Sequence, residues 1–237
     1  MKRQLFSLVL IGLVTWGTSV ARADFLSNGN LDSIAISGQT LATPVGWVAS
    51  ATKSVSGPFS DGMSSETFAN ISAAGGYGVF FKPFQGTLTD TLTASLYQDN
   101  PATAGLTYTL SGWAGAGAGY IGLTDPTVKS EFHLQFFNAA NTLIGDSTLN
   151  LVSNGQHVLG SPNGGNAFGY FDYTLSATAP AGTATVRTLA TIIGAYGNPA
   201  GGDQAFVVDA FTLVPEPSVF SLAILGLGSL LAFRRRK

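Results

Sequence analysis

Short segments in which apolar and polar residues alternate constrain the fold of this chain more than any other feature. In residues 131–136, Glu131, His133 and Gln135 alternate with three apolar residues. A period of two is typical of a β-strand with one buried face, whereas an amphipathic helix repeats its apolar residues every three or four positions. Alternating and apolar segments predict ten strands, at residues 33–37, 45–49, 77–84, 88–97, 107–111, 131–136, 142–151, 170–178, 186–193 and 204–213.

Turn-forming residues separate these segments. Asn154-Gly155 and Asn198-Pro199 are examples, and residues 138–141 are suited to a hairpin loop between two strands. Many short strands with such turns predict an all-β protein, an antiparallel β-sandwich of the jelly-roll type. No internal repeat or linker divides the middle of the chain, so we expect a single domain over residues 24–213.

Charged residues make up only 10% of the 237 residues, and their distribution is uneven. Between Asp24 and Val214 there are four basic and twelve acidic residues, a formal charge of −8. Such a domain repels phosphate backbones and anionic lipid, which argues against nucleic acid as a partner. Cysteine is absent from the sequence, which excludes disulfides, thiol nucleophiles and cysteine-ligated zinc.

The first 23 residues have the pattern of a secretory signal peptide. Lys2 and Arg3 precede an apolar run, and Ala21-Arg22-Ala23 supplies the small residues that signal peptidase recognises. The mature chain is then expected to begin at Asp24. The alternative is an N-terminal membrane anchor that is never removed.

The C-terminal residues 214–237 fall into three parts. Pro215-Glu216-Pro217 is followed by an apolar run at 218–233 and then by Arg234, Arg235, Arg236 and Lys237. As a helix the run would be about 24 Å long, close to the thickness of a bilayer core. Because basic residues stay in the cytoplasm, a transmembrane helix at 218–233 would hold the domain outside the cytoplasmic membrane, at least transiently.

This order of tripeptide, apolar helix and basic end resembles the PEP-CTERM sorting signal of bacteria that produce exopolysaccharide. The resemblance implies recognition by exosortase, a membrane transpeptidase, through Pro215, Glu216, Pro217, Arg234, Arg235 and Arg236. It also implies removal of the tail, and a final location at the cell surface or outside the cell. A permanent single-span anchor is the alternative.

Several pieces of the central domain resemble the galactose-binding-like jelly rolls of carbohydrate-binding modules. They are residues 27–32, the Gly46-Trp47 pair, the strand at 106–111 and the strand at 206–211. The resemblance implies a structural calcium ion between the first and last strands, held by Asp32 and Asp209, and no other cofactor. Ala210 replaces the second aspartate of the family pattern. Period two also places Asp209 beside Val207, Phe211 and Leu213, where a carboxylate needs a partner.

Aromatic residues are the candidate ligand-binding groups. Regular alternation places Trp113 on the same face as Thr107, Thr109 and Ser111, where its ring could stack on a sugar. A bulge at Gly112 would instead turn Trp113 into the core. Tyr120 and Tyr170 are the next candidates for such a platform.

The sequence offers little to an enzyme. His133 and His157 are expected to be surface residues, and Glu131 with Asp172 is the one carboxylate pair considered for glycoside hydrolysis. The leading hypothesis is an exported, non-enzymatic protein whose sandwich associates with extracellular polysaccharide. The alternatives are a structural or adhesive protein that binds other proteins, and a hydrolase with an unrecognised site.

Overall fold

The structure is a computed structural model that describes residues 24–35, 42–54, 62–71, 75–81, 90–153, 159, 168–197 and 205–216. The strands within these ranges are β1 (Val48–Lys53), β2 (Met63–Glu66), β3 (Gly78–Phe81), β4 (Leu92–Pro101), β5 (Thr107–Ala116), β6 (Lys129–Asn138), β7 (Leu143–Asn150), β8 (Phe171–Thr178), β9 (Thr183–Ala195) and β10 (Phe206–Glu216). Two 3-10 turns, η1 (Thr67–Ala69) and η2 (Ile121–Leu123), join them. No helix in these ranges is long and apolar enough to cross a membrane. The transmembrane helix predicted at 218–233 lies outside the described residues.

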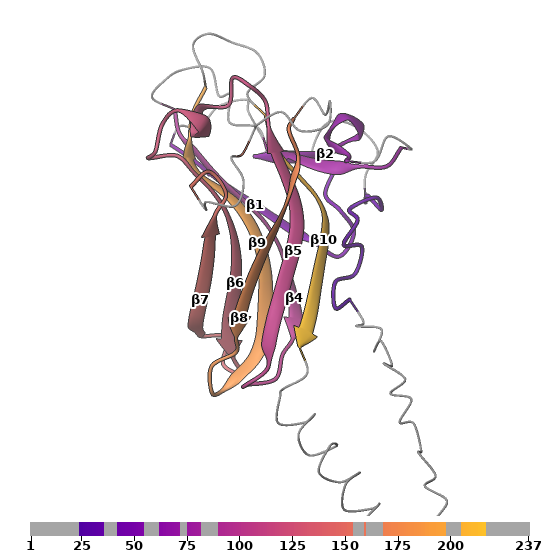
Figure 1. The fold of residues 1–237 in the computed structure, drawn as a ribbon, viewed down its shortest axis with the longest axis vertical. Helices are drawn as coiled ribbons and strands as arrows, with labels where there is room; N and C mark the ends of the chain where they lie inside the picture. Colours follow the sequence, from indigo (N-terminus) through magenta and orange to yellow (C-terminus); the bar gives the residue numbers. More distant parts are fainter. Residues whose placement is uncertain are drawn as a thin grey trace, which may run out of the picture.

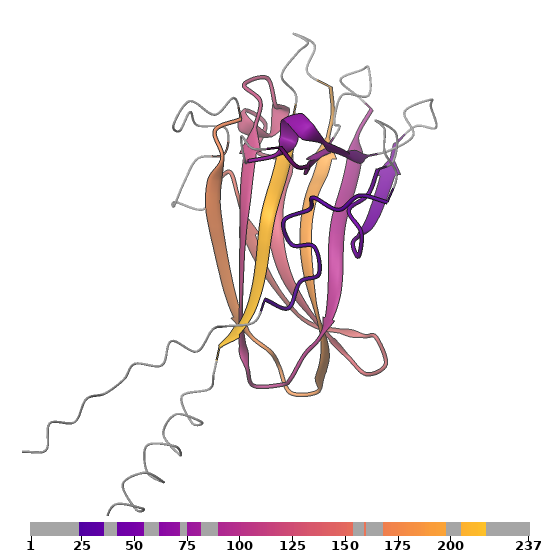
Figure 2. The same ribbon diagram turned by 90° about the vertical axis from the view of Figure 1, so that its right-hand side faces the viewer.

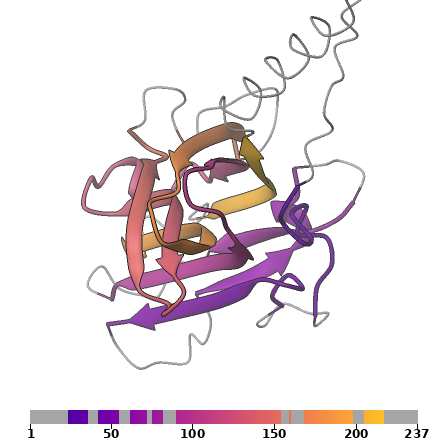
Figure 3. The same cartoon turned by 90° about the horizontal axis from the view of Figure 1, so that it is seen from below.

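The strands form two five-stranded antiparallel sheets that pack face to face (Figures 1 and 3). We call the sheet with the order β1-β4-β9-β6-β7 sheet I, and the sheet with the order β2-β3-β10-β5-β8 sheet II. From β7 to β10 each strand lies in the other sheet from the strand before it. These crossovers confirm the predicted antiparallel β-sandwich.

Nine of the ten predicted strands have a counterpart in the structure, with ends that differ by several residues. The prediction of a strand at 33–37 is wrong for residues 33–35, the part that the structure describes, because Ile34 forms only an isolated bridge with Pro44. Strand β2 was not predicted, since its four residues contain no alternation that marks a buried face. The hairpin loop at 138–141 is confirmed, with a hydrogen bond from Asn138 N–H to Thr142 O at 3.0 Å.

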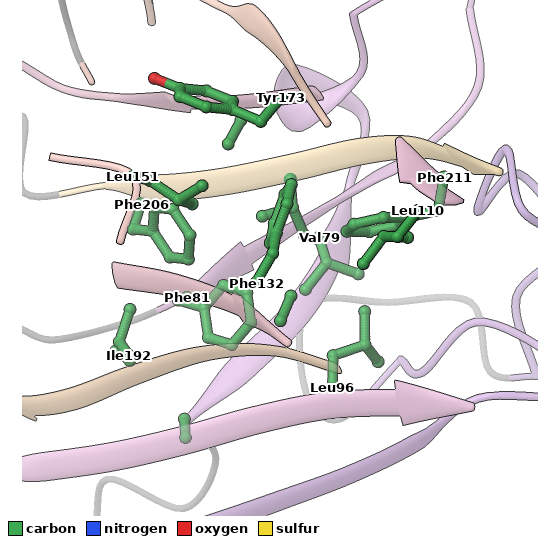
Figure 4. Close-up of a cluster of buried hydrophobic side chains, with 14 of the residues drawn as sticks. Val79, Phe81, Leu96, Leu110, Phe132, Leu151, Tyr173, Ile192, Phe206 and Phe211 are labelled. Atoms are coloured by element: carbon green, nitrogen blue, oxygen red, sulfur yellow. The ribbon is translucent and has the colours of Figure 1, made fainter. Parts of the chain in front are cut away.

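The core lies between the two sheets, where alternate residues of each strand meet (Figure 4). Phe132 of β6 packs edge-on against Phe211 of β10, with ring centroids 5.1 Å apart, and against Tyr173 of β8 at 6.2 Å. Aromatic pairs of this geometry contribute about 0.5–1.5 kcal/mol each beyond the area that they bury. These contacts join β6 of sheet I to β10 and β8 of sheet II.

The first described residues close one side of the sandwich, and Figure 2 shows them beside β10. Phe25 N–H donates to Leu213 O at 2.9 Å, and Leu213 N–H donates to the Asp24 carboxylate at 2.9 Å. On sheet I, the buried Gln98 side chain accepts from Ser27 N–H and donates to Ser27 O, both at 2.9 Å. This segment therefore ties the edge of β10 to β4 in the opposite sheet.

Candidate functional site

The outward face of sheet I carries a group of charged and amide side chains, although the chain as a whole is poor in charge. Register places Asp99, Arg187, Gln135 and Asp146 side by side across β4, β9, β6 and β7. A second row contains Tyr97, Leu189 and His133. Because the intervening residues face the core, all of these side chains point to the opposite side of the sheet. We call this surface the charged face; its members are Tyr97, Asp99, Glu131, His133, Gln135, Asp146 and Arg187.

Arg187 is fixed at one end of the charged face. Its Nε and Nη2 donate to the two carboxylate oxygens of Asp99, at 2.7 and 2.8 Å. Its guanidinium carbon also lies 3.9 Å from the ring centroid of Tyr97 and 4.8 Å from that of Phe137. The hydrogen bonds to Asp99 raise the pKa of Arg187 above its ordinary value. A planar cation with both a bidentate carboxylate and aromatic contacts has few alternative conformations.

His133 lies between two carboxylates in the middle of the charged face. Its Nδ1 is 3.0 Å from Asp146 Oδ1, and its Nε2 is 3.2 Å from Glu131 Oε2. Gln135 Nε2 also donates to Asp146, at 2.9 Å. Only 8% of His133 is exposed, so the expectation of an ordinary surface histidine is wrong. Glu131 on β6 and Asp146 on β7 cover the ring and share hydrogen bonds with it. His157 lies outside the described residues.

The carboxylate pair considered for hydrolysis does not form. Glu131 belongs to the outward face of sheet I, whereas Asp172 of β8 points outward from sheet II, opposite Trp113. The whole thickness of the sandwich separates the two carboxylates. They therefore cannot flank one glycosidic bond, which requires two carboxylates within about 10 Å.

Tyr120 and Tyr170 are buried, which corrects their assignment as sugar platforms. Tyr120 is 1% exposed, stacks on Phe206 and shares a hydrogen bond of 2.8 Å with Ser130 Oγ. Tyr170 is 3% exposed, and its hydroxyl donates to Ala69 O. Burial raises the pKa of both phenols. Neither ring offers a face to a ligand from solvent.

Trp113 lies on the outward face of sheet II, as regular alternation predicted. The register of β5 against β8 runs unbroken from Thr107 to Ala114, so no bulge at Gly112 turns the ring inward. The side chain is half-buried, because it packs with Ile71 and Phe168 against a small apolar cluster of Ala69, Phe80, Tyr170, Ala205 and Val207. Its role in sugar binding stays a prediction.

Asp209 also lies on the outward side of sheet II, and this corrects its expected neighbours. The register of β10 against β5 shifts between Asp209 and Thr212, and Ala210 has a positive φ of 50°. This bulge turns Phe211 and Leu213 into the core, away from the carboxylate. Asp209 Oδ2 accepts from Ile71 N–H at 2.8 Å, and Oδ1 accepts from Ala210 N–H at 2.6 Å. Burial raises the pKa of Asp209 to about 6, and the charge of Asp32 contributes in the same direction.

The charge of Asp32 helps to raise the pKa of Asp209, and a calcium ion shared by the two carboxylates would relieve this repulsion. Asp32 already accepts from Tyr77 N–H at 2.8 Å and from the amides of Asn30 and Asn70 at 2.7 and 3.3 Å. Calcium takes six to eight oxygen ligands. Within the described ranges no group of three or more His, Cys, Asp or Glu residues is arranged to hold a metal ion, so backbone or amide oxygens would have to complete the shell. The calcium site stays a prediction.

Two residues of the sorting tripeptide belong to the folded domain. Pro215 lies opposite Tyr108 and Glu216 opposite Thr107, so β10 continues three residues past the predicted domain boundary at 213. Thr109 Oγ1 donates to Glu216 Oε1 at 3.1 Å. Pro217, Arg234, Arg235 and Arg236 lie outside the described residues.

Fold and C-terminus together define an exported β-sandwich protein with a sorting signal. Residues 213–237 match the PEP-CTERM protein-sorting motif, which confirms the resemblance at the C-terminus. No curated protein is similar enough in sequence to count as a match.

Among solved structures, the sandwich is similar to part of the enzymatically active domain of tailspike protein 4 from bacteriophage CBA120. The TM-score is 0.51 at 12% identity, over 81% of this chain and 21% of that one, so this protein spans about a fifth of the tailspike domain. Module TmCBM61, solved with β-1,4-galactotriose, gives a TM-score of 0.46 at 12% identity, over 82% of this chain and 99% of the module. A family 16 carbohydrate-binding module gives a TM-score of 0.42 at 16% identity, over 65% of this chain and 85% of the module. At these identities the likeness is one of fold.

The charged face is what the sequence alone did not reveal. Its members come from four strands that are up to 90 residues apart in the chain, and only register brings them together. A partial signal was present, because Glu131, His133 and Gln135 occupy one face of a single predicted strand.

Proposed function

We propose that this protein is exported, loses its C-terminal tail to the sorting enzyme, and associates with extracellular polysaccharide through the charged face. Binding, with no catalysis, is the role proposed for the sandwich. The observation that carries the proposal is the row of Asp99, Arg187, Gln135 and Asp146, in which Asp99 holds Arg187 and Asp146 holds Gln135 by hydrogen bonds.

Such a row suits a hydroxyl-rich ligand. Carboxylates accept, guanidinium and amide groups donate, and a sugar presents both kinds of hydrogen-bonding partner on neighbouring hydroxyls. Because mutual contacts already orient the side chains, little conformational entropy is lost when a ligand binds. The core of a protein–protein interface, in contrast, is depleted in charged residues.

Accessibility also favours the two ends of this row over the centre of the charged face. Side-chain exposure is 40% for Asp99 and 32% for Asp146, against 13% for Glu131. The first two carboxylates therefore keep oxygen atoms open to a ligand. The more buried Glu131 and His133 support them from the centre of the sheet.

An adhesive, protein-binding role is the second candidate, and one observation favours it. Phe68 is 49% exposed and lies against Phe80 and Phe168, with ring centroids 5.2 and 6.1 Å apart. Exposed aromatic rings in a cluster are common at protein interfaces. Phe68→Ala should weaken capture of a protein partner without changing retention on polysaccharide.

Affinity electrophoresis of the mature protein through the producing organism's own polysaccharide tests the first proposal. Gln135→Ala and Asp146→Ala should each reduce retention several-fold, because each removes a group from the row. Ser176→Ala, a polar change on the outward face of sheet II, is the matched control and should leave retention unchanged. Equal retention of all three variants, with unchanged melting, would reject the charged face as the binding site.

A further inference from the structure

The end of β10 performs two tasks at once, because it is both a structural strand and the start of the sorting motif. Residues 214–216 pair with Thr107, Tyr108 and Thr109 of β5. The Glu216 carboxylate also accepts the hydrogen bond from Thr109. An enzyme that recognises Pro215-Glu216-Pro217 has to contact groups that the sandwich already uses.

The backbone directions in this segment show which groups are used. Leu213 N–H and C=O bond to Asp24 and Phe25, so they point away from β5. Since directions alternate along a strand, the amide groups of Val214 and Glu216 point toward β5 and those of Pro215 point away. Pro215 lacks an N–H, and at this position the loss removes no hydrogen bond from the ladder. Pro215 and Glu216 are thus both compatible with pairing to β5.

Leu213 marks the inner limit of the segment that can open. Its side chain is fully buried in the core, and its backbone is held by the N-terminal segment. Val214, Pro215 and Glu216 are only half-buried. Residues 214–216 can therefore leave β5 while the core stays closed. Opening at Leu213 would expose its buried side chain.

We propose that the fold withholds the sorting motif: residues 214–216 must unpair from β5, with Leu213 as the hinge, before the sorting enzyme can take up Pro215-Glu216-Pro217. The consequence is that tail removal proceeds at a rate set by local opening of β10. This inference rests on the proposed processing of the tail.

A pair of engineered disulfides tests the proposal in the full-length chain, which has no cysteine of its own. Thr109→Cys with Val214→Cys would lock the segment that has to open, since the two residues are direct partners and both side chains point outward. Ser111→Cys with Thr212→Cys is the matched control, because it locks the strand just inside Leu213. Opposed residues in antiparallel strands are about 4.5–5.5 Å apart at Cα, within the range of a disulfide.

Pulse-chase labelling in cells that process the protein gives the readout, with and without reductant. The 109–214 lock should slow tail removal at least tenfold, and reductant should restore it. The 111–212 lock and the single Val214→Cys variant should be processed like the unsubstituted chain. Processing of the 109–214 lock at the control rate, with the disulfide shown to be formed, would overturn the gating inference alone. An unsubstituted chain that keeps its tail would instead overturn the proposed processing, and the gating inference with it.

Discussion

Trp113 of β5 and Asp209 of β10 lie directly opposite each other in the antiparallel ladder of sheet II. The sequence singled out both residues, for separate reasons. The bulge at Ala210 begins one residue further along β10, so this pair is the last one before the register of β10 against β5 shifts. The half-buried ring and the buried carboxylate thus share one surface, and their properties have to be tested together.

The first prediction concerns the stability of the protein as a function of pH. Asp209 has a pKa of about 6 in the folded protein, against an ordinary value of 3.8, so the folded state binds the proton more tightly. The stability gained from protonation is fully present below about pH 4 and is lost as the pH rises to 6. A shift of this size corresponds to roughly 2–3 kcal/mol. The free energy of unfolding should therefore decrease from pH 4 to 6, and Asp209→Asn should abolish most of that slope.

Chemical denaturation at several pH values measures this effect. Thr174→Ala is the control, because it changes an exposed residue of the same sheet and removes no titratable group. The control should keep the wild-type slope. A slope that is equal in wild type and Asp209→Asn would show that Asp209 titrates normally.

The second prediction concerns calcium. An ion between Asp32 and Asp209 would favour the charged form of both carboxylates and remove their repulsion. Millimolar calcium should then raise the Tm at pH 7 more than at pH 5, and chelation should reverse the increase. Asp209→Asn should not respond. A wild-type Tm that is the same in calcium, magnesium and chelator would contradict the site.

The third prediction concerns Trp113. Because its ring packs with Ile71 and Phe168, Trp113→Ala should lower the free energy of unfolding by about 1–3 kcal/mol without unfolding the domain. If the charged face binds the ligand, retention on polysaccharide should persist in this variant. Loss of retention in a folded Trp113→Ala protein, with Gln135→Ala retained normally, would place the ligand on sheet II.

The fourth prediction concerns Gly112, which separates Ser111 from Trp113 in β5. A Cβ atom at this position would lie 2.4 Å from Cδ1 of Phe211 in the opposite strand. Gly112→Ala should therefore destabilise the protein by about 1–3 kcal/mol through overpacking. Phe211→Leu should recover part of the loss in the double variant, as measured by thermal melting. Additive losses would show that the two residues do not compete for this space.

The sequence predicted the sandwich because its signals are local. Alternation in residues 131–136 and the turn at 138–141 each depend on a few neighbouring residues, and period two follows from the geometry of a single strand. The sorting signal is local in the same sense. Strand β2 was missed because its pairing with β3 is its main structural feature, and no pattern within Met63–Glu66 indicates that pairing.

The sequence by itself determined the fold class and the order of motifs at the C-terminus, and it left two positions open for Trp113. Only the tertiary structure decided the neighbours of each functional group. Register brought Asp99 to Arg187 and Asp146 to His133 across strands distant in the chain, and the bulge at Ala210 separated Asp209 from Phe211. Pairing with β5 also extends β10 through Glu216, which makes the first two residues of the sorting tripeptide part of the domain. The physical reason is that a strand's own alternation fixes which side each residue faces, whereas pairing between strands and their irregularities fix what each residue meets there.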